Sequence, residues 1–374
     1  MVQVNRPEMS AKSSLASLDS APHRRADHLA VSEGQVSAQP APVEAAPDLK
    51  MYRSRAGFDA IMSWYDDTLA TIAVPVESRY VQTRFGRTHL LVAGPVGATP
   101  LLLIPGVAGC APLWRRQFPE LSRHFRVYAL DIPGQPGRSD PHPPSFLNDD
   151  FADWLRDVLD GLGAARAHVA GVSVGAWIAM RFAIAAPERV LGVVMLGPTG
   201  LSNARLPWRI WLTRVMKKGK DADALQDDLT AKSVTSKSPG GSFGTFDRTL
   251  ARAMALCTRH YRVDWSLGIY DETTRRVNIW QGLKVLRKFF LSEPRSLLAR
   301  FASPGLLVFG EHEVLYNPHR IAARAAGIMP GLKTVVVAGA GHAAVYDRPE
   351  EVNQLMIDFL QSAELPASTN KNTR

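Results

Sequence analysis

The chain has 374 residues, a formal net charge of +9, 46% hydrophobic residues and 21% charged residues, a composition typical of a soluble globular enzyme. Its two cysteines, Cys110 and Cys257, exclude a disulfide framework and fit a reducing compartment, so we expect a cytoplasmic protein. Because no run of about 18 apolar residues occurs and the N-terminus lacks an apolar signal region, we expect no transmembrane helix, no stable membrane insertion and no secretory signal.

The first 50 residues are rich in Ala, Ser, Pro and Gln and contain no Phe, Trp or Tyr. Such a segment cannot bury enough apolar surface to offset the conformational entropy that folding costs. We therefore predict a disordered N-terminal tail over residues 1–50, and a second short tail over residues 366–374.

The first ordered element predicted is an amphipathic helix over Phe58–Ile72, where apolar residues recur at helical spacing until the chain approaches Pro75. The pattern then changes to that of strands. Tyr80–Phe85 and Thr88–Val92 flank Gly86–Arg87, an arrangement that predicts a β-hairpin turning at the glycine.

From residue 101 onward, short apolar runs typical of strands buried on both faces alternate with helical stretches. The predicted strands are Leu101–Ile104, Val127–Leu130, His168–Val172, Val190–Leu196, Gly305–Phe309 and Thr334–Val337. The predicted helices are Asn148–Leu162, Val174–Ala185, Pro318–Ala326 and Pro349–Leu360. This alternation predicts a parallel sheet with helices on both faces, which binds ligands at the carboxyl ends of its strands.

Residues 201–290 interrupt the alternation with amphipathic pieces and the breaker Pro239–Gly240–Gly241. We interpret them as a mainly helical cap inserted after Val190–Leu196, which leaves residues 51–200 and 291–365 as the core. Residues 201–300 also hold nineteen Lys and Arg against nine Asp and Glu. This surplus is most simply a solvated surface, and the alternative is attraction of anionic substrates or a membrane surface. No nucleic-acid-binding motif accompanies it, so we expect no nucleic-acid partner.

The sequence Gly171–Val172–Ser173–Val174–Gly175 lies between a predicted strand and a predicted helix. In that context G-x-S-x-G forms a sharp turn that projects the serine hydroxyl above the sheet, with small residues on either side because the turn leaves no room for larger ones. The helix N-terminus that follows favours developing negative charge. We therefore predict that Ser173 is a nucleophile.

A serine hydroxyl needs a base to remove its proton, and the base needs an acid to orient it. His342 follows the last predicted strand in a loop of small residues and is the best-placed histidine. After the strand Gly305–Phe309 two carboxylates compete: Glu313 is our choice and Glu311 the alternative. The order Ser173, Glu313, His342 is that of a hydrolase triad on an open parallel sheet.

Two backbone N–H groups are needed to stabilise the oxyanion of an acyl-transfer reaction. One belongs to the residue after the nucleophile, Val174. The other is expected from the loop Pro105–Gly109, with Val107 as the donor. No metal-ligand spacing or glycine-rich phosphate loop occurs, so we expect no metal and no cofactor.

Together with the segments Asp131–Gly134 and Gly137–Ser139, these motifs resemble the α/β-hydrolase superfamily, in particular its serine esterase and lactonase-like members. The resemblance covers about Tyr80 to Leu360. It implies an α/β-hydrolase fold: a mostly parallel eight-stranded sheet with helices on both faces and a helical cap inserted after strand 6. One departure is an extra residue at Gln135–Pro136, in a loop that borders the pocket in that family.

The resemblance and the motifs lead to one predicted function and two alternatives. We predict a serine hydrolase that cleaves a carboxylic ester, lactone or thioester of a small molecule through an acyl-enzyme on Ser173. An acyltransferase or biosynthetic thioesterase would use the same triad. A non-catalytic binding protein that retains the fold is the third possibility. The sequence carries no signature of an oligomeric state.

Overall fold

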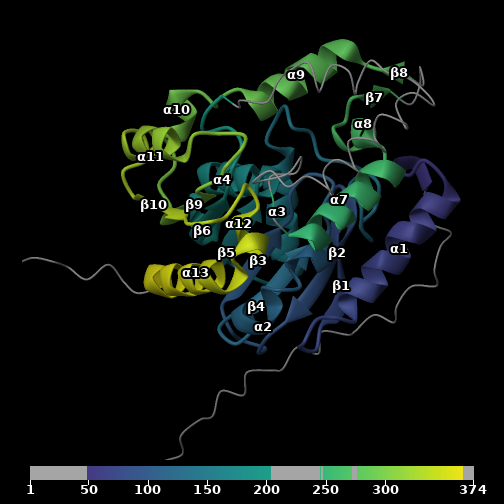
Figure 1. Ribbon diagram of the computed structural model, residues 1–374, viewed down its shortest axis with the longest axis horizontal. Coiled ribbons are helices and arrows are strands. Elements are labelled where there is room, and N and C mark those ends of the chain that lie inside the picture. Colours follow the sequence, from purple (N-terminus) through teal and green to yellow (C-terminus); the bar gives the residue numbers. More distant parts are fainter. Residues whose placement is uncertain (1–48, 204–244, 246, 272–275, 365–374) are drawn as a thin grey trace, which may run out of the picture. The chain divides into compact units, whose positions relative to one another are not determined.

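The computed structural model describes residues 49–203, 245, 247–271 and 276–364. Its centre is an eight-stranded sheet in the order β1-β2-β4-β3-β5-β6-β9-β10 (Figure 1). The strands are β1 (Glu77–Thr83), β2 (Gly86–Ala93), β3 (Pro100–Ile104), β4 (Arg126–Leu130), β5 (Ala167–Val172), β6 (Val190–Leu196), β9 (Gly305–Gly310) and β10 (Leu332–Val337). The predicted tails, apart from Leu49 and Lys50, lie outside the described residues.

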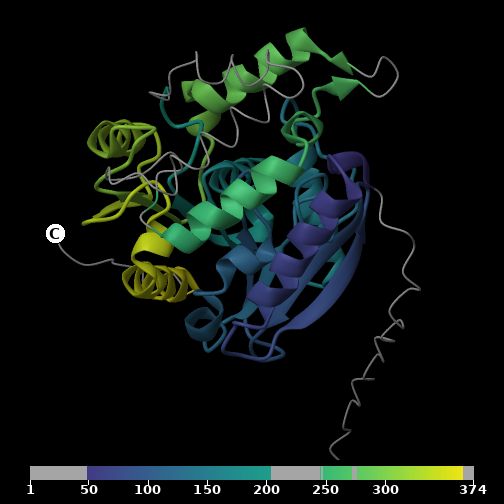
Figure 2. The same ribbon diagram turned by 45° about the vertical axis from the view of Figure 1, so that its right-hand side comes forward.

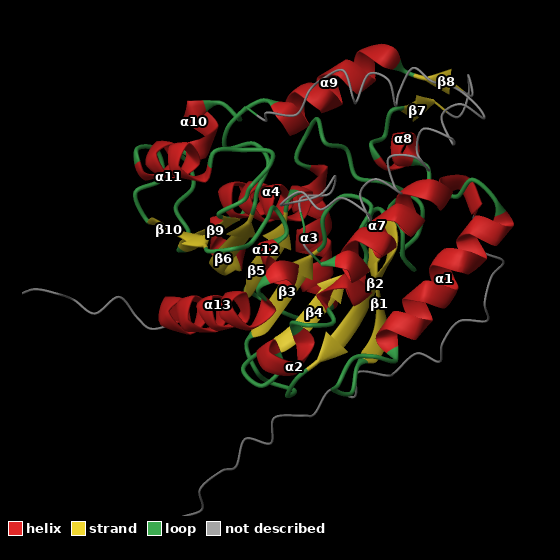
Figure 3. Ribbon diagram, in the orientation of Figure 1, coloured by secondary structure: helices red, strands yellow, loops and turns green. Residues whose placement is uncertain are grey.

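Only β2 runs against its neighbours. It pairs antiparallel with β1 and with β4, and every other neighbouring pair in the sheet is parallel. Parallel neighbours require crossover connections, and the crossovers place helices over the sheet. The predicted mostly parallel eight-stranded sheet with helices on both faces is therefore confirmed (Figure 3).

The two faces of the sheet bury two separate hydrophobic cores. On one face pack α3 (Asp150–Gly161), α4 (Val174–Ala185) and α11 (Pro318–Ala326). On the other pack α1 (Arg55–Leu69), η2 (Ala111–Trp114), α2 (Phe118–Leu121), α12 (Ala344–Asp347) and α13 (Pro349–Glu364). Along β3, Leu102 and Ile104 enter the first core while Leu101 and Leu103 enter the second. This alternation explains why the strand reads as one continuous apolar run.

Several predicted elements differ from the structure at their ends, most clearly the first helix and the hairpin. Helix α1 stops at Leu69 instead of Ile72 and begins after Ser54, whose Oγ accepts the Gly57 N–H at 3.0 Å. The predicted hairpin turn at Gly86–Arg87 is wrong: Thr83 pairs with Gly86, so Arg84–Phe85 form the turn. Gly86 follows it as the first residue of β2 with φ +89°, a left-handed backbone conformation that favours glycine.

Between β6 and β9 the described residues are mainly helical. They comprise α7 (Arg248–His260), α8 (Val263–Ser266), β7 (Tyr270–Asp271), β8 (Arg276–Val277), α9 (Ile279–Phe290) and α10 (Arg295–Leu298). The predicted breaker Pro239–Gly241 lies outside the described residues, and the boundaries 201–290 of the cap stay a prediction. None of the helices described here has the length and apolarity needed to span a bilayer.

Helix α7 lies alongside α1, as both views of the ribbon show (Figures 1 and 2). The two helices approach closely at Gly57, where an added Cβ would lie 2.9 Å from the Cβ of His260. Just beyond them Tyr52 and Tyr261 form an isolated antiparallel bridge. The first residues that the structure describes are thereby fixed to the end of α7.

Candidate active site

Ser173 lies at the sharp turn between β5 and α4, where the strand-to-helix motif predicts it. Its backbone has φ +55° and ψ −111°, a conformation that a non-glycine residue rarely takes. The flanking glycines are sterically required: a Cβ on Gly171 would lie 2.3 Å from the carbonyl carbon of Gly175, and a Cβ on Gly175 would lie 2.3 Å from the Ile104 oxygen. The turn is therefore strained and closely packed, as a nucleophile elbow is.

His342 and Glu313 lie in direct contact above the last two strands of the sheet. The Nδ1 atom of His342 is 2.7 Å from Oε2 of Glu313, and Oε1 of Glu313 accepts the Leu315 N–H at 2.8 Å. The Glu313 side chain has 0% exposure and that of His342 has 11%. The competing carboxylate Glu311 is exposed and accepts the Gly339 N–H at 2.9 Å. The structure thus pairs the histidine with Glu313.

Two glycines at the ends of β9 and β6 let the backbone of the His342 loop approach the sheet closely. A Cβ on Gly310 would lie 2.1 Å from the Gly341 oxygen, and one on Gly197 would lie 3.0 Å from the His342 oxygen and 3.2 Å from its ring. Gly197 directly follows β6, the strand next to the one that leads to Ser173. The loops carrying the serine, the acid and the histidine therefore leave the same edge of the sheet.

Tyr316 is a buried aromatic neighbour of Glu313. Tyr316 is 1% exposed and takes part in the hydrophobic core under α11. Its burial raises the pKa of the phenol, and the negative charge of Glu313 raises it further. Tyr316 consequently stays neutral and does not compete with the Glu313 carboxylate for its contact with His342.

The predicted oxyanion donors are Val107, in a turn that approaches Ser173, and Val174, the residue after it. The turn Gly106–Gly109, closed by the Gly109 N–H on the Gly106 oxygen at 3.0 Å, carries Val107 next to the elbow. A Cβ on Gly106 would lie 3.7 Å from the Cβ of Ser173. Val174 is the first residue of α4. Within the described part of the chain, neither the Val107 N–H nor the Val174 N–H donates to another residue.

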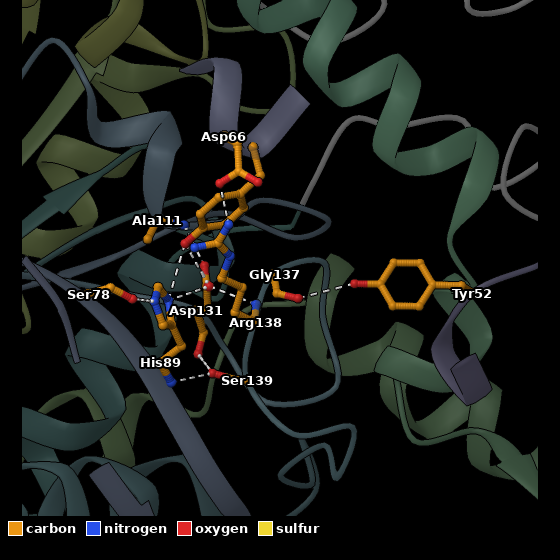
Figure 4. A network of polar contacts seen from close by, with 10 residues as sticks. Tyr52, Asp66, Ser78, His89, Ala111, Asp131, Gly137, Arg138 and Ser139 are labelled. Atoms are coloured by element: carbon orange, nitrogen blue, oxygen red, sulfur yellow. Dashed lines mark hydrogen bonds and ion pairs between the residues drawn. The ribbon is translucent and has the colours of Figure 1, made fainter. Parts of the chain in front are cut away.

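A second serine–histidine–aspartate set, missed in the sequence analysis, joins β1, β2 and the residue that follows β4 (Figure 4). Ser78 Oγ is 2.6 Å from Nε2 of His89, and Nδ1 of His89 is 2.9 Å from Oδ2 of Asp131. Asp131 also accepts hydrogen bonds from Ala111 N–H, Arg138 N–H and the Tyr65 hydroxyl. The signal available in the sequence was a lone histidine inside a strand of otherwise apolar residues, His89–Val92.

This second set anchors a loop and lacks the features of the elbow. Ser78 is exposed on the extended strand β1, whereas Ser173 stands at a strained turn before a helix. Asp131 and His89 are fully buried. Position 137, at φ +139°, accepts only glycine, since a Cβ on Gly137 would lie 2.5 Å from Cγ of Asp131. The buried carboxylate thus organises residues 131–139, the loop that the family resemblance places beside the pocket.

The other chemistry-bearing groups do not join either set. Cys110 and Cys257 are buried free thiols, and burial raises the pKa of the Cys110 thiol, which the neighbouring Cys257 raises further. Among residues 49–203, 245, 247–271 and 276–364, no group of three or more His, Cys, Asp and Glu side chains is arranged to hold a metal ion.

With this geometry established, comparison with known proteins identifies the family. The family described as alpha/beta hydrolase fold matches residues 99–349. The chain belongs to this family. The match spans the serine turn, the acid and the histidine, and the predicted superfamily and fold are confirmed.

Individual relatives within the family are esterases. The carboxylesterase YbfK of Bacillus subtilis is 31% identical over 79% of this chain and 92% of its own length. The crystal structure of that protein superposes with a TM-score of 0.67 over 82% of this chain and 99% of its own, at 26% identity. The crystal structure of naproxen esterase from Bacillus subtilis matches with a TM-score of 0.62 and 26% identity, over 84% of this chain and 99% of its own. The prediction of an α/β-hydrolase enzyme with esterase relatives is confirmed.

Proposed function

We propose that this chain is a carboxylesterase that hydrolyses esters of small molecules through an acyl-enzyme on Ser173. The observation that carries the proposal is the pairing of His342 with Glu313, at 2.7 Å, on the same sheet edge as the strained Ser173. The carboxylesterase relatives, which align over about four fifths of the chain, support the choice of an ester as the bond that is cleaved.

In the first half of the proposed reaction, Nε2 of His342 takes the proton of the Ser173 hydroxyl as Oγ bonds to the ester carbonyl carbon. The carbonyl π electrons move to oxygen, and the oxyanion accepts hydrogen bonds from the N–H groups of Val107 and Val174. Glu313 holds the proton on Nδ1 and stabilises the imidazolium. Collapse of the tetrahedral intermediate breaks the bond to the alcohol, whose oxygen takes the proton from His342.

In the second half, His342 removes a proton from water and the hydroxide oxygen bonds to the acyl carbon. The second tetrahedral intermediate returns the bonding electrons to Oγ of Ser173, which regains its proton from His342 as the carboxylic acid leaves. The only co-reactant is water. We infer that residues 201–290 form a cap that contributes the substrate-facing surface. The presence of the helices α7 and α9 in that region supports this inference.

Nitrophenyl esters of increasing acyl length and a fluorophosphonate probe test the proposal together. The wild-type protein is expected to turn over short esters and to gain one phosphonyl group on Ser173, detected by peptide mass spectrometry. The Ser173→Ala variant is expected to do neither. Adding an alcohol or amine acceptor separates hydrolysis from acyl transfer, because only the latter yields a new ester or amide. Wild-type protein that neither hydrolyses esters nor reacts with the probe would overturn the proposal.

A further inference from the structure

Within the described residues, only two that are not glycine adopt a positive φ: Ser173 at +55° and Ala108 at +57°. Both lie at the predicted active site, on loops that follow the neighbouring strands β5 and β3. The strain at Ser173 is explained by the elbow. The strain at Ala108 requires a separate cause, because an alanine in this region relaxes unless its surroundings hold it.

Ala108 occupies the third position of the turn Gly106–Gly109, which the hydrogen bond between its ends closes at 3.0 Å. A positive φ at that position identifies a type II turn, where glycine is normally found. The group that holds the turn is Gln135, whose side-chain Oε1 accepts the Ala108 N–H at 2.8 Å. Both residues are almost fully buried, at 1% and 2% exposure, so water does not compete for this bond.

The loop that carries Gln135 is itself fixed on both sides. The Tyr261 hydroxyl, at the end of α7, donates to the Gly134 oxygen at 2.8 Å. The Tyr52 hydroxyl donates to the Gly137 oxygen at 3.2 Å, as Figure 4 shows. Burial raises the pKa of both phenols above its usual range, so both remain donors throughout the pH range of a hydrolase assay. Gln135 thus connects a rigid loop to the turn.

We propose that Gln135 is a positioning residue for ester hydrolysis: it holds the turn that carries the Val107 N–H in its strained type II form, with Tyr261 anchoring the Gln135 loop to α7. This inference rests on the proposed function. It also accounts for the extra residue at Gln135–Pro136, which lengthens the loop and supplies the side chain that reaches Ala108.

The physical consequence concerns the transition state more than substrate binding. Without an acceptor, the peptide between Val107 and Ala108 can rotate so that Ala108 takes a negative φ. The turn is then no longer held in one form, so the preceding peptide, which carries the Val107 N–H, can shift as well. A donor that leaves its place weakens the hydrogen bond to the oxyanion, which exists only in the transition state and the tetrahedral intermediates. Losing Gln135 should therefore lower kcat and leave KM nearly unchanged.

Gln135→Met tests this, because methionine has a similar length and no oxygen acceptor. Since losing one oxyanion donor outright costs roughly 10²–10³-fold in kcat, a displaced donor should cost about 10-fold, with KM within about twofold. Thr88→Val is the matched control: it removes a buried acceptor, the hydroxyl that the Trp154 indole N–H contacts at 2.9 Å, at a distance from the site. The control should lose stability and keep its kcat. A Gln135→Met protein that keeps the wild-type kcat, or loses no more of it than the control, overturns the proposal.

A second variant separates positioning from general damage. In the double variant Gln135→Met with Ala108→Gly, the glycine takes a positive φ without strain, so the turn keeps its form and part of the lost kcat should return. No recovery in the double variant would contradict a role through the turn.

The hydrogen bond from the Ala108 N–H to Gln135 can also be measured without catalysis, by hydrogen exchange of the Ala108 amide. Exchange at Ala108 is expected to be slow in the wild type and at least about tenfold faster in Gln135→Met. If the Ala108 amide exchanges as slowly in Gln135→Met as in the wild type, Gln135 does not hold the turn, and the proposal is overturned whether or not the protein is active. Failure of the proposed function is recognised separately, by a wild-type protein that has the protected amide and no esterase activity.

Discussion

The Nδ1 atom of His342 lies 2.7 Å from Oε2 of Glu313, although the two residues are 29 positions apart in the sequence. Glu313 is fully buried and uses its second oxygen to accept a backbone N–H, so its orientation is fixed before any substrate binds. An imidazole held in this way keeps its proton on Nδ1 and presents Nε2 as the base.

Replacing Glu313 tests the tautomer that it imposes. Glu313→Gln keeps the size of the side chain but removes the charge, and should lower kcat on the order of 10⁴-fold, as an amide does at this position of a triad. Glu311→Gln is the control, because an amide oxygen can still accept the Gly339 N–H, and its kcat should stay within about threefold of the wild type. Steady-state kinetics on one nitrophenyl ester compare the two. Equal losses in both variants would show that the pairing has no catalytic role.

Ser173, in the predicted triad, and Ser78, in the second serine–histidine–aspartate set, should differ sharply in reactivity. Ser173→Ala is expected to lower kcat/KM on the order of 10⁴-fold or more, whereas Ser78→Ala should change it by no more than about threefold. The reason is geometric: Ser78 has its histidine at 2.6 Å but stands on an extended strand, and Ser173 stands at the strained turn. Fluorophosphonate labelling of each variant, located by mass spectrometry, makes the comparison. A label on Ser78 in the Ser173→Ala protein would contradict this assignment.

A buried carboxylate fixes the segment after α9 to the helix that follows the elbow. Glu293 accepts the Trp177 indole N–H at 3.0 Å, lies 3.4 Å from Lys288 and 3.8 Å from Arg181, and has a 2% exposed side chain. Glu293→Ala leaves a buried indole donor without its acceptor and removes the negative charge beside Arg181 and Lys288, and should lower the free energy of unfolding by about 2 kcal/mol.

Urea denaturation measures this loss, and two further variants calibrate it. Glu293→Gln keeps an acceptor for the indole and should lose less stability than Glu293→Ala. The exposed Glu188, replaced by alanine, should change the free energy of unfolding by no more than about 0.5 kcal/mol. A Glu293→Ala protein as stable as the Glu188→Ala protein would show that the buried contacts contribute nothing.

Stability should fall with decreasing pH in a way that depends on His168. Burial lowers the pKa of this imidazole, and the hydrogen bond to Glu364 at 3.0 Å offsets only part of that shift. The unfolded chain therefore binds a proton near pH 6.5 that the folded protein does not accept, so the free energy of unfolding decreases as the pH drops below that value. Above about pH 7.5 both states are neutral and the effect vanishes.

Urea denaturation of the wild type and of His168→Gln between pH 7.5 and pH 5 checks this. Glutamine does not titrate, so the variant should lose less stability over this range than the wild type does. Curves that decline in parallel would show that His168 is not the group responsible.

Much of the fold could be predicted because its signals are local. Continuous apolar runs arise where a strand is buried on both faces, and β3, β5 and β6 were predicted to within a residue at either end for this reason. The limits of α4 and α11 were also correct, since glycines, prolines and caps mark helix ends in the sequence. The hairpin turn was misplaced because Gly86 follows the turn residues, and only the strand register reveals on which side of a glycine the chain reverses.

The sequence by itself determined the strained turn at Ser173, because no other residues than Gly171 and Gly175 fit so close to the neighbouring backbone. It left two carboxylates open as the partner of His342, and the tertiary structure pairs that histidine with Glu313. The tertiary structure also formed the Ser78–His89–Asp131 contacts and placed Gln135 on Ala108. These contacts join residues between 11 and 42 positions apart. Local spacing carries no information about which side chains meet across such gaps, since sheet order and loop packing decide it.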